Sequence, residues 1–127
     1  MLHSQYEEYI SIPQNLPCVF YKNLERTKFN YSKNTNWHKN LEIEFCNNGE
    51  GYILLNGKSH SFSKDNIAVV NSNSIHYTGS DAFLDYDCLI IDTKFCCNAG
   101  IDPQKLCFKS IIQDKHIKKQ IAKIREI

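Results

Sequence analysis

The sequence predicts a mainly β fold, an antiparallel barrel followed by C-terminal helices. Up to about residue 92, short runs of β-type residues alternate with turn residues. No segment between these runs is long enough for a helical crossover, so neighbouring strands are expected to pair antiparallel. After Phe95 the periodicity of the apolar residues changes to that of helices.

The first predicted strand covers residues 18–21, and a polar loop follows through Asn36. The sequence leaves open one further strand near Phe29. Residues 41–45 are apolar at odd positions and acidic at even ones, as in a half-buried strand. The turn residues at 47–49 are expected to end that strand.

A β-hairpin is the strongest local signal in the chain. It joins residues 52–55 to residues 58–62 through Asn56-Gly57, a pair that accepts the positive φ values of a two-residue type I′ turn. Two more strands, at residues 67–70 and 84–91, bring the prediction to at least six.

Two helices are predicted after the barrel. A short one covers 103 to about 108, because Asp102 is a good N-cap and proline suits the first helical position. The second places Ile117, Ile121 and Ile124 on one apolar stripe, which is too costly to leave in water and must pack on the barrel or on a partner. No residue typical of a helix end precedes the last position, so we expect a piece of a longer polypeptide.

Composition excludes several classes of protein. A chain of 127 residues suits one globular domain, and 15 Lys+Arg against 14 Asp+Glu do not supply the basic field of a stand-alone nucleic-acid binder. No apolar run is long enough to span a membrane, and the first residues lack the features of a signal peptide. The six cysteines show no regular spacing, so we expect reduced thiols in a cytoplasmic protein.

Polar residues at predicted strand ends are the candidate site, because barrels hold small ligands at their mouths. Trp37 and His38 precede one strand and His76 follows another. The spacing His38-x3-Glu42-x6-Gly49, then the hairpin, then Asn-Ser-Asn-Ser-Ile-His ending at His76, resembles the two motifs of the cupin family.

A narrower resemblance is to the N-terminal sensing domain of AraC-type transcription regulators. It is carried by Trp-His-Lys-Asn-Leu-Glu-Ile-Glu at 37–44, Gly-Glu-Gly at 49–51 and Asn-Gly-Lys at 56–58. The ordered series of motifs carries the resemblance, over roughly residues 35 to 92, and no single motif decides it.

This resemblance implies a cupin-like double-stranded β-helix over residues 1–100 and the start of a helical dimerisation region over 101–127. A helix-turn-helix DNA-binding domain would lie beyond the chain. The implied function is sensing of a small effector, often a sugar, by a homodimer that has no enzymatic activity, cofactor or membrane contact. We expect the effector to contact four side chains: Trp37, His38, Glu42 and His76.

Metal-dependent cupins use two histidines and a glutamate from the first motif and a histidine from the second. Here Asn36 stands where the first histidine belongs, which leaves His38, Glu42 and His76. Glu42 points opposite to Ile43 in a regular strand, so it meets the histidines only if the apolar face of that strand packs outward. The sequence leaves this open, and we expect no metal. The alternatives are a metal-dependent cupin enzyme, an oxygenase or isomerase, and a carbohydrate-binding barrel.

Overall fold

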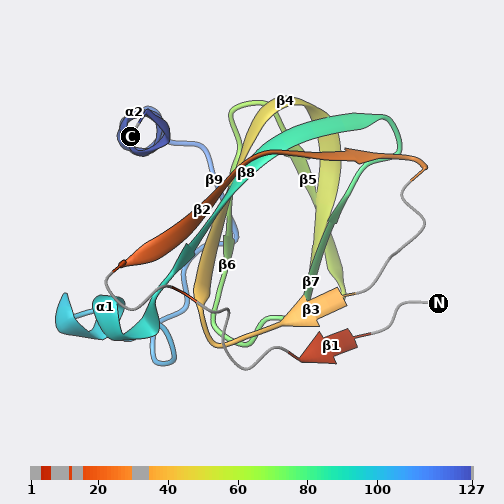
Figure 1. Cartoon of the computed structure of the whole chain (residues 1–127). Helices are drawn as coiled ribbons and strands as arrows, with labels where there is room; N and C mark the ends of the chain where they lie inside the picture. Colours follow the sequence, from red (N-terminus) through yellow and green to blue (C-terminus); the bar gives the residue numbers. More distant parts are fainter. Residues whose placement is uncertain (1–3, 7–11, 13–15, 30–34, 127) are drawn as a thin grey trace.

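A long curved strand organises the barrel in the computed structural model, which describes residues 4–6, 12, 16–29 and 35–126. This strand, β4, covers Leu41–Leu55. Figure 1 shows two groups of strands facing each other, with α2 outside them. Within the described residues the other elements are β1 (Ser4–Tyr6), β2 (Cys18–Thr27), β3 (Thr35–Trp37), β5 (Lys58–Ser63), β6 (Ile67–Val70), β7 (His76–Gly79), β8 (Phe83–Ile91), α1 (Thr93–Asn98), β9 (Ile111–Ile112) and α2 (Lys115–Arg125).

β4 belongs to both groups of strands. Its first part pairs with β6 and β8, and its second part pairs with β5 and β7. The strand end predicted at 47–49 is wrong, because the chain there forms a β-bulge and the strand continues. Gly49 makes the bulge possible: its φ is +82°, and a Cβ at this position would lie 2.1 Å from the carbonyl oxygen of Phe83.

Most of the predicted strands are confirmed. The hairpin pairs Leu55 with Lys58, and positive φ values at Asn56 and Gly57 fit the type I′ turn. β6 and β8 lie where the two last strands were expected. β2 begins at the predicted residue but extends to Thr27, and the chain near Phe29 forms a turn.

The structure adds strands that the apolar pattern did not indicate. β7 is one of them, because its sequence His-Tyr-Thr-Gly is buried throughout and shows no alternation. β1 pairs in parallel with β3, so the expectation of a wholly antiparallel sheet is wrong at this edge. A long connection separates the two strands, which permits a parallel arrangement. The other pairings among the described residues are antiparallel.

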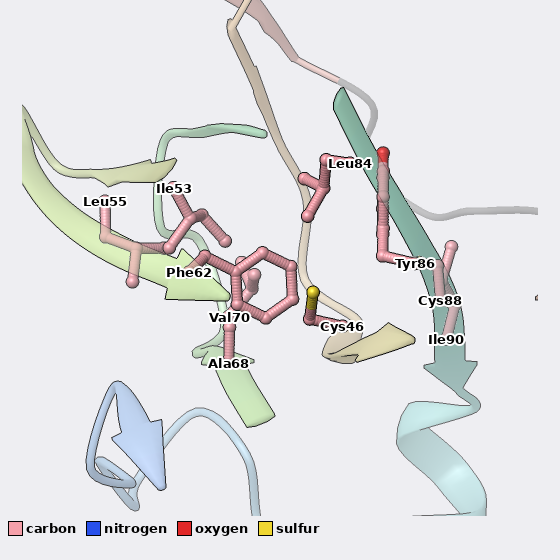
Figure 2. Packing of buried hydrophobic residues seen from close by; sticks show 10 residues of the cluster. All are labelled: Cys46, Ile53, Leu55, Phe62, Ala68, Val70, Leu84, Tyr86, Cys88 and Ile90. Carbon is pink, nitrogen blue, oxygen red and sulfur yellow. The ribbon is translucent and has the colours of Figure 1, made fainter. Parts of the chain in front are cut away.

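The core lies between the two groups of strands. Side chains from β4, β5, β6 and β8 meet there, and Figure 2 shows Phe62 at the centre of this interior cluster. Phe62, Ile53 and Leu84 are completely buried. The cluster comprises Cys46, Ile53, Leu55, Phe62, Ala68, Val70, Leu84, Tyr86, Cys88 and Ile90.

The odd-numbered residues of the first part of β4 face outward. Phe45 forms an outer cluster with Ile67 and Leu89, and Ile43 packs against its edge. Alternation therefore turns Glu42, Glu44 and Cys46 toward the interior. The question that the sequence left open is settled, because the apolar face packs outward.

The helices differ in part from the expectation. The predicted helix at 103–108 is wrong: the backbone N–H groups of Lys105 and Leu106 donate to Asp102 in a single turn, and the chain then extends. The side chain of Asn71 holds the extended segment through two hydrogen bonds to Phe108. Its Oδ1 accepts from the backbone N–H at 2.8 Å, and its Nδ2 donates to the backbone carbonyl at 2.9 Å. α1 was not predicted, and it begins at its N-cap Asp92.

α2 is confirmed, with Asp114 as its N-cap. Ile121 packs against the outer cluster of its own barrel, whereas Ile117 and Ile124 are 37% and 36% exposed. Arg125 and Lys118 pair with Asp87 and Asp65 of the barrel. No helix in the described part of the chain is long and apolar enough to cross a membrane.

Candidate functional site

Two histidines and a glutamate meet in the barrel interior. His38 follows β3, Glu42 lies near the start of β4, and His76 begins β7. Nε2 of His38 lies 3.2 Å from Oε1 of Glu42, and Nε2 of His76 lies 3.5 Å from Oε2. Each of these side chains is at most 9% exposed. We call this set the histidine triad.

The backbone fixes the orientation of both rings. Nδ1 of His38 lies 3.0 Å from the carbonyl oxygen of Asn40, and Nδ1 of His76 lies 3.0 Å from that of Ser74. Because a carbonyl oxygen only accepts, both Nδ1 atoms carry a hydrogen. A neutral ring then presents the lone pair of Nε2 to Glu42. Two lone pairs facing one carboxylate require a positive charge, either a proton on a ring or a bound cation.

A second carboxyl group, that of Glu44, lies beside Glu42. Burial alone would raise the pKa of Glu42, but hydrogen bonds from Glu44 and from the protonated forms of His38 and His76 outweigh it and hold that pKa well below its usual value. Burial and the neighbouring Glu42 carboxylate raise the pKa of Glu44 well above its usual value. Of the two carboxyl groups, Glu42 is therefore the more acidic, and Glu44 is the one that retains a proton to higher pH.

Thr78 and Arg26 complete the polar part of the interior. The hydroxyl of Thr78 donates to Oε1 of Glu44 at 2.6 Å. Nε of Arg26 donates to the carbonyl oxygen of Thr78 at 3.1 Å, and its guanidinium lies over the ring of Tyr86. The positive charge of Arg26 favours ionisation of Glu44, but burial and Glu42 outweigh it.

Cys88 brings a thiol to the same carboxyl groups. Its Sγ and carboxylate oxygens of Glu42 and Glu44 all lie within 4.8 Å of one another. Burial and the two carboxyl groups raise the pKa of the thiol, so it is protonated when nothing else binds it. We call Glu42, Glu44 and Cys88 the acid–thiol set.

The structure places Trp37 differently from the histidine triad. Asn36 lies directly opposite His76 in the β3–β7 pairing, so these two side chains share one face. Trp37 follows Asn36 and is half-buried on the other face of β3. Oδ1 of Asn36 is buried and has no hydrogen-bond partner within the described part of the chain.

The histidine triad fits a divalent transition metal, as metal-dependent cupins would require. Two imidazole nitrogens and one carboxylate oxygen lie within 4.8 Å of one another, and this donor set suits Fe(II), Mn or Zn. The Nδ1 bonds to carbonyl oxygens orient Nε2 as an outer ligand shell does. The condition that strand alternation placed on a metal site is met, because the outer cluster leaves Glu42 facing the barrel interior.

The four side chains expected to contact the effector do not include Glu44, Thr78, Arg26 or Cys88. Glu44 was detectable in principle, because it shares the face of Glu42 on an alternating strand. Cys88 belongs to the six cysteines for which the sequence predicts only reduced thiols. Its position opposite Glu44 depends on the register between β4 and β8, which no local pattern reveals.

Comparison with known proteins supports the fold. No protein-family model matches the chain, and no curated protein sequence matches it. Among solved structures, the chain is similar to ToxT from Vibrio cholerae strain SCE256 with a bound unsaturated fatty acid, at 14% identity and a TM-score of 0.59. That match covers 88% of this chain and 46% of ToxT, so the chain spans about half its length.

Two further structures are similar to the chain. ToxT from Vibrio cholerae O395 gives 13% identity and a TM-score of 0.55, over 87% of this chain and 47% of that one. A cupin 2 conserved barrel domain protein from Salinispora arenicola gives 13% identity and a TM-score of 0.49, over 74% of this chain and 80% of that one. The similarity to the two ToxT structures is a similarity of fold. The topology of the chain is that of a cupin-like double-stranded β-helix with C-terminal helices.

Proposed function

We propose that this chain is the effector-sensing domain of an AraC-type transcription regulator. The observation that carries the proposal is the buried histidine triad inside the barrel. A ligand pocket needs a few convergent polar groups among apolar walls, and the triad and the interior cluster supply both. The motifs between residues 35 and 92 support the assignment to this family.

The effector would be a small molecule whose polar end meets the triad. The hydroxyl groups of a sugar can donate to the ionised Glu42, whereas a carboxylate would be attracted by protonated histidines and repelled by Glu42. One similar structure, ToxT, contains an unsaturated fatty acid. Both ligand classes therefore belong in the test.

Dimerisation and DNA binding complete the proposal. A homodimer would form through α2, whose Ile117 and Ile124 remain exposed. DNA would be bound by a domain outside this chain, in the cytoplasm. An effector that binds one arrangement of barrel and helices more tightly would shift the dimer toward it.

The test uses the 127-residue chain in a chelating buffer with monosaccharides and an unsaturated fatty acid. Thermal unfolding and calorimetry detect binding. His38→Ala and His76→Ala are expected to weaken binding at least about ten-fold, because each removes a group that touches the ligand. His60→Ala is the matched control, since His60 is half-buried on β5 outside the triad. Unchanged affinity in both triad variants would contradict the site.

A metal-dependent cupin enzyme is the second candidate, and the donor geometry of the histidine triad favours it. His38, Glu42 and His76 would hold the ion, which would supply a Lewis acid. The barrel walls around the triad would exclude water. Elemental analysis of protein grown with added iron, manganese and zinc decides: one equivalent lost in His76→Ala supports the enzyme.

A further inference from the structure

The acid–thiol set is buried as deeply as the histidine triad. Glu42, Glu44 and Cys88 are 4%, 3% and 6% exposed. Only Glu42 belongs to both sets, and neither Glu44 nor Cys88 has a part in the proposed effector function. Their placement therefore calls for its own explanation.

The strand register holds the three side chains together. Glu44 pairs directly with Cys88 across β4 and β8, which brings their Cβ atoms to about 4.5–5.5 Å. Glu42 lies two residues before Glu44 on the same face. Thr78 donates to Glu44 from β7 and orients its carboxyl group. All the groups project from paired strands, so little conformational entropy is lost when they bind an ion.

The charges in this set require a positive partner. Two carboxylates at this separation cannot both be ionised in a buried site unless a cation or a proton compensates them. Arg26 makes its hydrogen bond with the carbonyl of Thr78. A divalent cation at the centre would compensate both carboxylates at once.

We propose that Glu42, Glu44 and Cys88 bind one thiophilic divalent cation of the Zn²⁺ type. Two carboxylate oxygens and a thiolate suit such an ion, whereas Mg²⁺ and Ca²⁺ prefer ligands that are all oxygen. Binding releases two protons to solvent, one from Glu44 and one from the thiol of Cys88. Three protein ligands leave the fourth position of a tetrahedral ion for a further ligand. Two of the three donors lie outside the histidine triad.

Cobalt tests the proposal, because Co²⁺ bound to a thiolate gives a charge-transfer band in the near ultraviolet. The parent for the titration carries Cys97→Ser and Cys107→Ser, which remove the two exposed thiols. We expect the band in this parent, its loss in Cys88→Ser, and at least about ten-fold weaker Co²⁺ binding in Glu44→Gln. Cys46→Ser is the control, because Cys46 is also buried in the interior cluster but its Sγ donates to the carbonyl of Asn48.

The His38→Ala/His76→Ala double variant separates this site from the histidine triad. The band is expected to persist in it. A parent without the band, a band lost in the double variant, or a band lost with Cys46 instead of Cys88 overturns the proposal. Circular dichroism in chelator shows which variants fold. If Cys88→Ser does not fold, the near-isosteric Glu44→Gln variant still tests the proposal. The effector titrations are made in chelator, so their failure leaves this result unaffected.

Discussion

Arg125 anchors α2 to the barrel, and Arg125→Gln tests how much this anchor contributes. Nε of Arg125 donates to Oδ2 of Asp87 at 2.7 Å. Asp87 is only 1% exposed, and its Oδ1 accepts from the backbone N–H of Asn23 at 2.9 Å and from the amide of Asn47 at 2.8 Å. The substitution therefore removes one of three donors from a buried carboxylate.

The expected loss follows from what remains. Stripping a buried ion pair of one partner costs about 3–5 kcal/mol, but Asn23 and Asn47 still satisfy Asp87. A hydrogen bond to a charged group contributes about 1.5–3 kcal/mol. Arg125 is 42% exposed, so solvent screens the pair and the lower end applies. We expect a decrease of about 1.5 kcal/mol in the free energy of unfolding.

Urea unfolding, followed by the fluorescence of Trp37, the single tryptophan, measures this loss. Lys118→Gln is the matched control on the same helix. The side chains of Lys118 and Asp65 are each 54% exposed, so solvent screens their ion pair and we expect it to contribute much less to stability than the Arg125–Asp87 pair. Equal losses in the two variants, or a loss below about 0.5 kcal/mol in Arg125→Gln, would refute the argument.

Three further predictions concern the interior, the bulge and the helix. Burial and Glu42 raise the pKa of Glu44 in the folded protein. The protonated carboxyl group therefore stabilises the fold fully below the pKa of the unfolded chain, near 4.5, and this stabilisation is lost as pH rises through the folded pKa. Glu44→Gln should therefore unfold at higher urea than the parent at pH 8 in chelator, with no difference near pH 4. Gly49→Ala should cost more than about 3 kcal/mol by thermal unfolding, because its Cβ would clash with a carbonyl, whereas Gly57→Ala, with the same φ and open space, should cost about 1 kcal/mol. Ile121→Asp should lower barrel stability by more than about 1 kcal/mol, because it places a charge against the outer cluster, and the more exposed Ile117→Asp should not.

Local signals predicted the elements whose residues decide their own conformation. The hairpin at Asn56-Gly57 is one case, because its two residues accept positive φ in any context. α2 is another, because its isoleucine stripe suffices to indicate a helix. Asp102 shows the limit of such signals. Its capping chemistry is present, but Asn71, far along the chain, binds Phe108 and draws the segment into an extended path.

Motif spacing predicted which three residues form the histidine triad. His38, Glu42 and His76 meet as the resemblance to cupins implies, although the direction of Glu42 could not be read from β4 alone. That direction depends on what covers the outer face. Ile121 of α2 and Phe20 of β2 cover it, and both come from elsewhere in the chain. The acid–thiol set depends on register across two strands, which is a property of the folded sheet.

The same two strands connect the interior to α2. On β4 and β8, Glu44 pairs with Cys88 on the inner face, and the next pair, Phe45 with Asp87, lies on the outer face. Asp87 holds Arg125, and a cavity of about 110 Å³ lies beneath the helix between these groups. Cys88 and Asp87 are adjacent residues of β8, so a single peptide unit separates the acid–thiol set from the carboxylate that anchors α2.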